Sequence, residues 1–193
     1  VVLYHSPFYK LGTINEFASN CYLFVDFFFI LSGFVMASAY QKRISEGFKF
    51  RDYFWLRLGR IYPLHLFFLV IWGIYVVIKW NLFNYQIELT DPLIKNTFVS
   101  FFSNIFLVHS LNFHNYTNWN YPSWSISVEF FTYFIFFAFA VLVQKRSQWT
   151  IAISAFLLAI ATYFYIFNGS NWTTIDFTVT NGIYRCCGGF FAG

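Results

Sequence analysis

The sequence predicts an all-α protein: a polytopic bundle of transmembrane helices. Of its 193 residues, 59% are hydrophobic and only 10% are charged, whereas soluble domains carry about 25% charged residues. A soluble fold this short needs more polar surface, because much of its area faces water. Aromatic residues make up 26% of the chain, which is typical of lipid-facing helices and of the belts at membrane interfaces.

Several apolar runs approach the roughly 20 residues that a spanning helix needs. Residues 1–4 are expected to end a first helix, and 182–193 to begin a further apolar segment. Complete spans are predicted at 21–40, 53–78, 124–143 and 149–167. The polar stretch 79–95 is predicted to be a loop. No internal repeat divides the chain, so we expect one membrane domain over 1–193, truncated at both ends because each end lies inside an apolar run.

Basic residues predict the orientation, because cytoplasmic loops are rich in Lys and Arg. Six such residues lie between Lys42 and Arg60, and Lys145 and Arg146 form a second group. Three complete spans between the groups would place them on opposite sides of the membrane, and two would place both in the cytoplasm. The stretch 97–111 is short and contains polar residues, so it either spans the membrane or is re-entrant or strongly tilted.

Five sites carry ionisable side chains that are costly in lipid, where such groups usually face a protein interior or a water cavity. They are His5, Asp26, Arg57 with Arg60, His65 and Glu129. Each has a structural alternative. Asp26 can anchor the start of its helix, the arginines can reach lipid headgroups, and Glu129 can interact with a helix dipole.

The arginine pair predicts an anion site. Arg57 and Arg60 are three residues apart, so they share one helix face. Guanidinium groups on one face suit phosphate, whose oxygens accept paired hydrogen bonds. Lipid headgroups and coenzyme A both offer phosphates, and the spacing does not choose between them.

Three segments carry a resemblance to a known family. "VDFFFILSGFVMA" (25–37), "FRDYFWLRLGRIYPLH" (50–65) and "PSWSISVEFFTYFIFF" (122–137) resemble, in that order, signature segments of the acyltransferase 3 family. "VVLYH" at the start is similar to the end of the family's first helix. The resemblance covers residues 1 to about 137 and implies roughly the N-terminal half of the family's domain.

The resemblance implies an integral membrane O-acyltransferase, expected in the bacterial inner membrane. Such enzymes move an acyl group, commonly acetyl, from acyl-CoA to a hydroxyl of a carbohydrate or related cell-surface acceptor. His5 matches the family's catalytic base, and Arg57 and Arg60 match the motif expected to engage acyl-CoA. Glu129 matches an acidic motif residue, and Asp26 matches the acidic position before paired aromatics. The family's arginine upstream of the histidine has no counterpart in this sequence.

Acyl transfer to a hydroxyl requires a base, and histidine, with a free pKa near 6.5, suits that task at neutral pH. A carboxylate that fixes its tautomer would assist, and Asp26 and Glu129 are both candidates. Direct transfer and a covalent acyl-histidine intermediate both remain open. The alternatives in other functional classes are a polytopic transporter and a non-catalytic protein that binds lipid or acyl-CoA.

Expected partners are acyl-CoA as the donor substrate, the hydroxyl acceptor and membrane lipid. We expect no bound cofactor. No metal site is expected, since the four histidines lack ligand spacing. No nucleic acid is expected either, since the basic residues follow the predicted topology rather than forming a spread basic surface.

Overall fold

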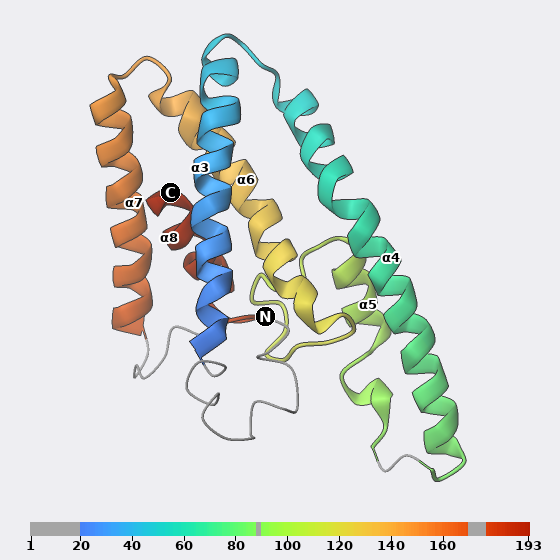
Figure 1. Ribbon diagram of the computed structural model, residues 1–193. Helices are drawn as coiled ribbons and strands as arrows, with labels where there is room; N and C mark the ends of the chain where they lie inside the picture. The colour runs from blue at the N-terminus through green and yellow to red at the C-terminus, as the bar shows by residue number, and fades with distance from the viewer. Residues whose placement is uncertain (1–19, 88–89, 170–176) are drawn as a thin grey trace.

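A computed structural model describes residues 20–87, 90–169 and 177–193, in which every regular element is a helix (Figure 1). Short 3₁₀ turns precede or connect the main helices: η2 (Asn20–Tyr22), η3 (Pro92–Ile94) and η4 (Tyr121–Ser123). The α-helices are α3 (Leu23–Ser45), α4 (Phe50–Asn84), α5 (Phe98–Ile105), α6 (Trp124–Val143), α7 (Gln148–Gly169) and α8 (Gly182–Ala192). The predicted all-α class is confirmed.

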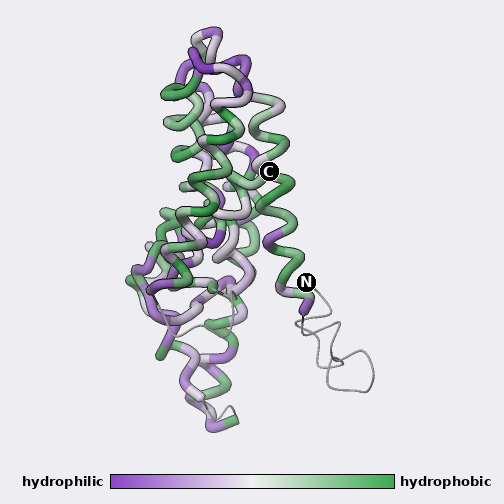
Figure 2. The backbone as a smooth tube through the Cα atoms, turned by 90° about the vertical axis from the view of Figure 1, so that its left-hand side faces the viewer, coloured by the Kyte–Doolittle hydropathy of each residue, from purple (hydrophilic) through white to green (hydrophobic). Residues whose placement is uncertain are grey.

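Within the described ranges, four segments are long and apolar enough to cross a membrane, and they correspond to the four complete spans predicted from the sequence. These are Asn20–Ser45, Phe50–Asn84, Tyr121–Val143 and Gln148–Asn168. Large apolar side chains are exposed along all four helices, as expected for surfaces that face lipid. Figure 2 shows hydrophobic residues along the helices and hydrophilic ones gathered at the turns at the top of the view. The chain is an integral membrane protein.

Helix α4 is longer than the sequence predicted. Residues 79–84, expected in a loop, continue the helix, and Asn81 donates a side-chain hydrogen bond to the carbonyl of Val77 at 2.8 Å. No Pro or Gly interrupts this stretch, so nothing local ends the helix before Gln86, whose φ is 59°. At 1.5 Å per residue its 35 residues extend about 52 Å, more than a bilayer core of about 30 Å requires.

The length of α5 decides whether two or three helices cross the membrane between the two basic groups. Its eight residues extend about 12 Å, too short to span. Ser100, Ser103 and Asn104 are buried on its inner face, while Phe98 and Phe102 are exposed. The segment is therefore too short to span, and among the described residues only α4 and α6 are long enough to cross between the two basic groups.

The two basic turns accordingly lie at the same end of the bundle (Figure 1). Lys42, at the end of α3, and Arg146, before α7, line one cavity of about 360 Å³. This arrangement agrees with both groups facing the cytoplasm.

The short helix α8 forms the centre of the fold, packed against α3, α6 and α7. Eight of its residues are buried, including Arg185, Cys186 and Phe190. Close approach to α3 depends on Gly33, because a Cβ there would lie 1.8 Å from the carbonyl oxygen of Phe190. Small residues at such contacts let membrane helices pack closely.

Candidate functional site

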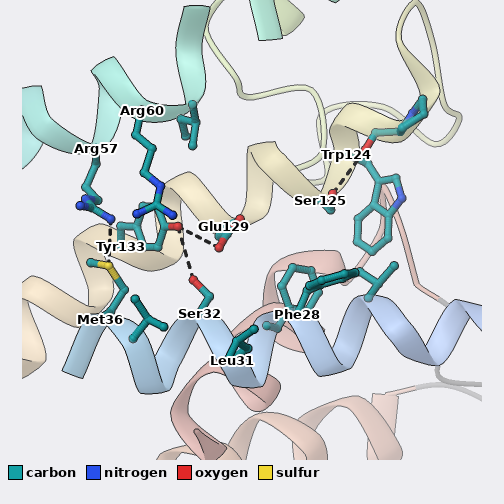
Figure 3. Close-up of a pocket in the computed structure, with 15 residues that line it drawn as sticks. Phe28, Leu31, Ser32, Met36, Arg57, Arg60, Trp124, Ser125, Glu129 and Tyr133 are labelled. Carbon is teal, nitrogen blue, oxygen red and sulfur yellow. Dashed lines mark hydrogen bonds between the residues drawn. The ribbon is translucent and has the colours of Figure 1, made fainter. Parts of the chain in front are cut away.

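A cavity of about 480 Å³ lies between α3, α4 and α6 (Figure 3). Arg57 and Arg60 reach it from α4, Glu129 and Tyr133 from α6, and Ser32 from α3. Arg57, Arg60 and Glu129, three of the six ionisable residues that the sequence singled out, thus line one cavity. The sequence did not identify Tyr133 or Ser32 as members of it.

Arg57 is a buried cation that has no acidic partner in the part of the chain that the structure describes. Only 7% of the residue is exposed, and its guanidinium donates to the hydroxyl of Tyr40 and, at 3.2 Å, to the sulfur of Met36. Its Nε is buried with no hydrogen-bond partner. Among the described residues, no carboxylate lies within ion-pair distance of Arg57. A buried charge is costly unless it is paired, so this position favours an anionic ligand.

Arg60 lines the same cavity one turn further along α4, as the three-residue spacing predicted. Unlike Arg57, it is exposed. Figure 3 shows both side chains extending from the helix toward the cavity. The pair therefore combines a buried guanidinium held by neighbouring side chains with an exposed one.

Glu129 faces these arginines across the cavity without pairing to them. Its Oε1 accepts a hydrogen bond from the hydroxyl of Tyr133 at 2.8 Å, since residues four apart meet on one helix face. The Tyr133 hydroxyl also lies 3.4 Å from the hydroxyl of Ser32, and Tyr53 donates to the Tyr133 carbonyl at 2.9 Å. No basic group of the described chain lies within ion-pair distance of Glu129.

Asp26 is placed differently. Arg185 donates from Nε to Oδ1 and from Nη2 to Oδ2 of Asp26, both at 2.8 Å, in a bidentate pair. Arg185 is fully buried, and its guanidinium also lies 5.5 Å from the centre of the Trp124 ring. Asp26 does not line the cavity, although Trp124 does. The sequence analysis did not identify Arg185. Its position inside the apolar segment 182–193 could have indicated it, because a charged residue in such a segment usually has a specific role.

His5, the predicted base, lies outside the described residues. His65 is buried, and its Nε2 lies 2.9 Å from the carbonyl oxygen of Asn104. Among the residues that the structure describes, no cluster of three or more His, Cys, Asp or Glu side chains is arranged to hold a metal ion.

Comparisons with known proteins point to one family. The family model described as "Acyltransferase domain" matches residues 1–193. A curated relative, "Protein 2 in picA locus" of Rhizobium radiobacter, is 42% identical over 60 residues. This match covers 31% of the present chain and 31% of the relative, less than a third of either. No solved structure matches the chain at a significant level.

Proposed function

The chain belongs to the acyltransferase family whose model matches residues 1–193, and from this premise we propose that it is an acyl-CoA-dependent O-acyltransferase. The acyl group, acetyl by the family resemblance, passes to a hydroxyl of a carbohydrate or related cell-surface acceptor. The proposed location is the bacterial inner membrane. One observation carries the proposal: two guanidinium groups and a carboxylate line one intramembrane cavity without pairing to each other.

The arginines would hold the donor. Arg57 has an unpartnered Nε and no acidic neighbour among the described residues, and Arg60 adds a second guanidinium on the same face. Guanidinium groups bind phosphate through paired, charge-assisted hydrogen bonds. Arg57 lies seven residues, or about 10 Å, along α4 from the start of that helix at the basic turn, the side from which a cytoplasmic donor such as acyl-CoA would enter.

Glu129 would assist the base. His5 would take the hydroxyl proton as the acceptor oxygen attacks the thioester carbonyl, the carbon–sulfur bond would break, and the proton would pass to the departing thiolate. A carboxylate that orients the imidazole and stabilises its charged form favours this step. Glu129 suits the role better than Asp26, because only one of its oxygens has a hydrogen-bond partner among the described residues, whereas Arg185 engages both oxygens of Asp26.

The test uses the full protein purified into nanodiscs, with radiolabelled acetyl-CoA and a panel of carbohydrate and polyol acceptors. We expect label transfer by the wild type. His5→Ala should abolish transfer while the protein still accumulates in the membrane. Glu129→Gln should lower kcat by about 10²-fold, in the range for general-base catalysis, and leave acetyl-CoA binding unchanged. Glu46→Gln is the matched control, because Glu46 is exposed in the basic turn, pairs with Lys42 at 3.8 Å and does not line the cavity.

Other outcomes identify the alternatives. Full transfer by the His5→Ala protein would remove His5 from the mechanism. Acetyl-CoA binding without turnover on any acceptor would indicate a non-catalytic binding protein. Substrate flux across the membrane without consumption of acetyl-CoA would indicate a transporter.

A further inference from the structure

Two groups of opposite charge line the cavity and stay apart. Arg57 and Glu129 both face it, yet the described part of the chain contains no ion pair between them. Opposite charges attract strongly in the low dielectric of a protein interior, so their separation has a structural cause. Figure 3 shows the Tyr133 side chain between the two, with its ring toward Arg57 and its hydroxyl toward Glu129.

The hydroxyl of Tyr133 holds the carboxylate of Glu129. It donates to Oε1 at 2.8 Å, and the two residues lie one turn apart on α6. Because this proton is committed to Glu129, the Tyr133 oxygen is the acceptor in its 3.4 Å contact with the hydroxyl of Ser32. Ser32 therefore donates to Tyr133, which donates to Glu129. This chain of hydrogen bonds fixes Oε1 and leaves Oε2 available to the base.

The ring of Tyr133 adjoins the buried arginine. The guanidinium carbon of Arg57 lies 5.7 Å from the centre of the Tyr133 ring and 4.7 Å from the centre of the Tyr40 ring. Aromatic rings attract a guanidinium at such distances. The Arg57 guanidinium also donates to the Tyr40 hydroxyl. Arg57 is thus held toward α3, while the Tyr133 ring occupies the space between Arg57 and Glu129.

Tyr133 is itself firmly placed. Only 5% of the residue is exposed, and its carbonyl accepts a hydrogen bond from the hydroxyl of Tyr53 on α4 at 2.9 Å. Phe190 of the central helix α8 packs edge-on against its ring, with 6.1 Å between the ring centres. A side chain locked by packing and hydrogen bonds in this way can fix the geometry of a neighbouring functional group.

We propose that Tyr133 is a positioning residue for the transfer reaction: its hydroxyl holds Glu129 for the base, and its ring keeps Glu129 from pairing with Arg57. This assignment rests on the proposed function and extends it, because it explains how the carboxylate of the base and the guanidinium of the donor site share one cavity without neutralising each other. Tyr133 acts through these two residues rather than on the substrates.

Tyr133→Phe removes the hydroxyl and keeps the ring. We expect kcat for acyl transfer to fall about tenfold, or about 1.4 kcal/mol, and the Kd for acetyl-CoA to stay unchanged because the ring still separates the charges. Adding Tyr133→Phe to Glu129→Gln should lower kcat no further, since residues that act as a unit are not additive. Tyr62→Phe is the matched control: it loses a hydrogen bond to the carbonyl of Ile105 at 3.0 Å, and Tyr62 does not line the cavity.

Tyr133→Leu removes the hydroxyl and the ring together. Glu129 can then reach Arg57, and the resulting ion pair should weaken acetyl-CoA binding about tenfold. Adding Glu129→Gln removes the competing charge and should bring the Kd back to the value of the Glu129→Gln protein. A merely structural role for Tyr133 predicts no such restoration. Thermal unfolding checks that each variant is folded.

Infrared spectra follow the hydrogen bond without any acyl transfer. The intact protein carries isotope-labelled glutamate, and the carboxylate band that Glu129→Gln removes belongs to Glu129. Tyr133→Phe should shift this band, because it removes the donor to Oε1. Tyr62→Phe should leave the band where it is in the wild type.

Three results would overturn the assignment and leave the proposed function standing: a wild-type kcat in Tyr133→Phe, a Glu129 band that Tyr133→Phe does not shift, or independent effects of Tyr133→Phe and Glu129→Gln on kcat. A wild-type Kd in a folded Tyr133→Leu protein would overturn the separating role of the ring. If Tyr133→Leu does not fold, Tyr133→Phe and the spectra still decide the positioning role. A wild-type protein that transfers no acyl group would refute the proposed function and the role of Tyr133 with it.

Discussion

The two arginines of the cavity should contribute unequally to donor binding. Arg57→Gln removes a guanidinium that is only 7% exposed and has no acidic neighbour among the described residues. Hydrogen bonds to charged groups contribute about 1.5–3 kcal/mol, and a loss of about 2 kcal/mol corresponds to roughly a 30-fold weaker Kd for acetyl-CoA. Arg60 is exposed, and exposed ion pairs contribute about 0–1 kcal/mol, so Arg60→Gln should weaken binding at most about fivefold.

Isothermal titration of a non-hydrolysable acetyl-CoA analogue into nanodisc-embedded protein measures both Kd values. Arg51→Gln is the control on the same helix, because Arg51 is exposed, contacts Asp52 at 3.5 Å and does not line the cavity. Raising the salt concentration should weaken the Arg60 contribution more than that of Arg57, since buried charges are less screened.

The ranking has a clear refutation. Equal effects of Arg57→Gln and Arg60→Gln on the Kd, or no effect of Arg57→Gln on a folded protein, would refute it. Either result would show that the buried Arg57 contributes no more to anion binding than the exposed Arg60. Arg57 also contacts Tyr40 and Met36, so thermal unfolding must show that the variant is folded. Charge reversal at both positions should weaken donor binding more than acceptor binding, and an equal loss of both would indicate misfolding.

Three further predictions concern stability. Asp26→Asn removes the carboxylate that pairs with the fully buried Arg185 and should cost about 3–5 kcal/mol, seen as a lower Tm in detergent that the additional change Arg185→Gln partly restores. Gly33→Ala places a Cβ 1.8 Å from a backbone oxygen of α8 and should sharply reduce folded yield, whereas Gly73→Ala, with nothing within 4 Å, should not. The pKa of His109 falls from 6.5 to about 4 on folding, so the unfolded state binds more protons between these values and stability falls as pH drops. The loss from pH 7.5 to 5 should be about 2 kcal/mol, and a His109→Gln protein that keeps this pH dependence would exclude His109 as its source.

Helix positions were largely predictable because hydrophobicity alone sets them. The span predicted at 124–143 coincides with α6 (Trp124–Val143), and the predicted span 149–167 lies within α7. The error at the end of α4 has a simple cause: Lys79, Trp80 and Asn81 are polar or interfacial residues that lowered the hydropathy without breaking the helix. Hydropathy reports where a helix leaves lipid, whereas backbone hydrogen bonding decides where it ends.

That α5 does not span was predictable only as one of the alternatives. Its outer face is as apolar as that of a spanning helix, so composition could not separate the two forms. Its length could: eight helical residues are followed by Leu107 with a φ of 58°, which turns the chain back. The contact between His65 on α4 and His109 after α5, whose ring centres lie 6.1 Å apart, depends on this turn, and no spacing in the sequence brings the two rings together.

The roles of the two intramembrane carboxylates, Asp26 and Glu129, could be distinguished only from the fold. Asp26 and Glu129 both lie near the start of an apolar helix, so sequence position could not rank them. Asp26 finds its partner 159 residues away in Arg185, and the pair joins α3 to the central helix α8. Glu129 has a tyrosine on one oxygen and no cation among the described residues. A buried charge that is paired inside the protein avoids the larger cost of an uncompensated charge, whereas a carboxylate left unpaired in a membrane cavity lowers stability and is typical of a site that meets a ligand or a proton. The same reasoning applies to Arg57. Glu129 and Arg57 line one cavity, and neither has a charged partner among the described residues. This shared cavity, rather than any one motif residue, favours a catalytic or ligand-binding role for them over a purely structural one.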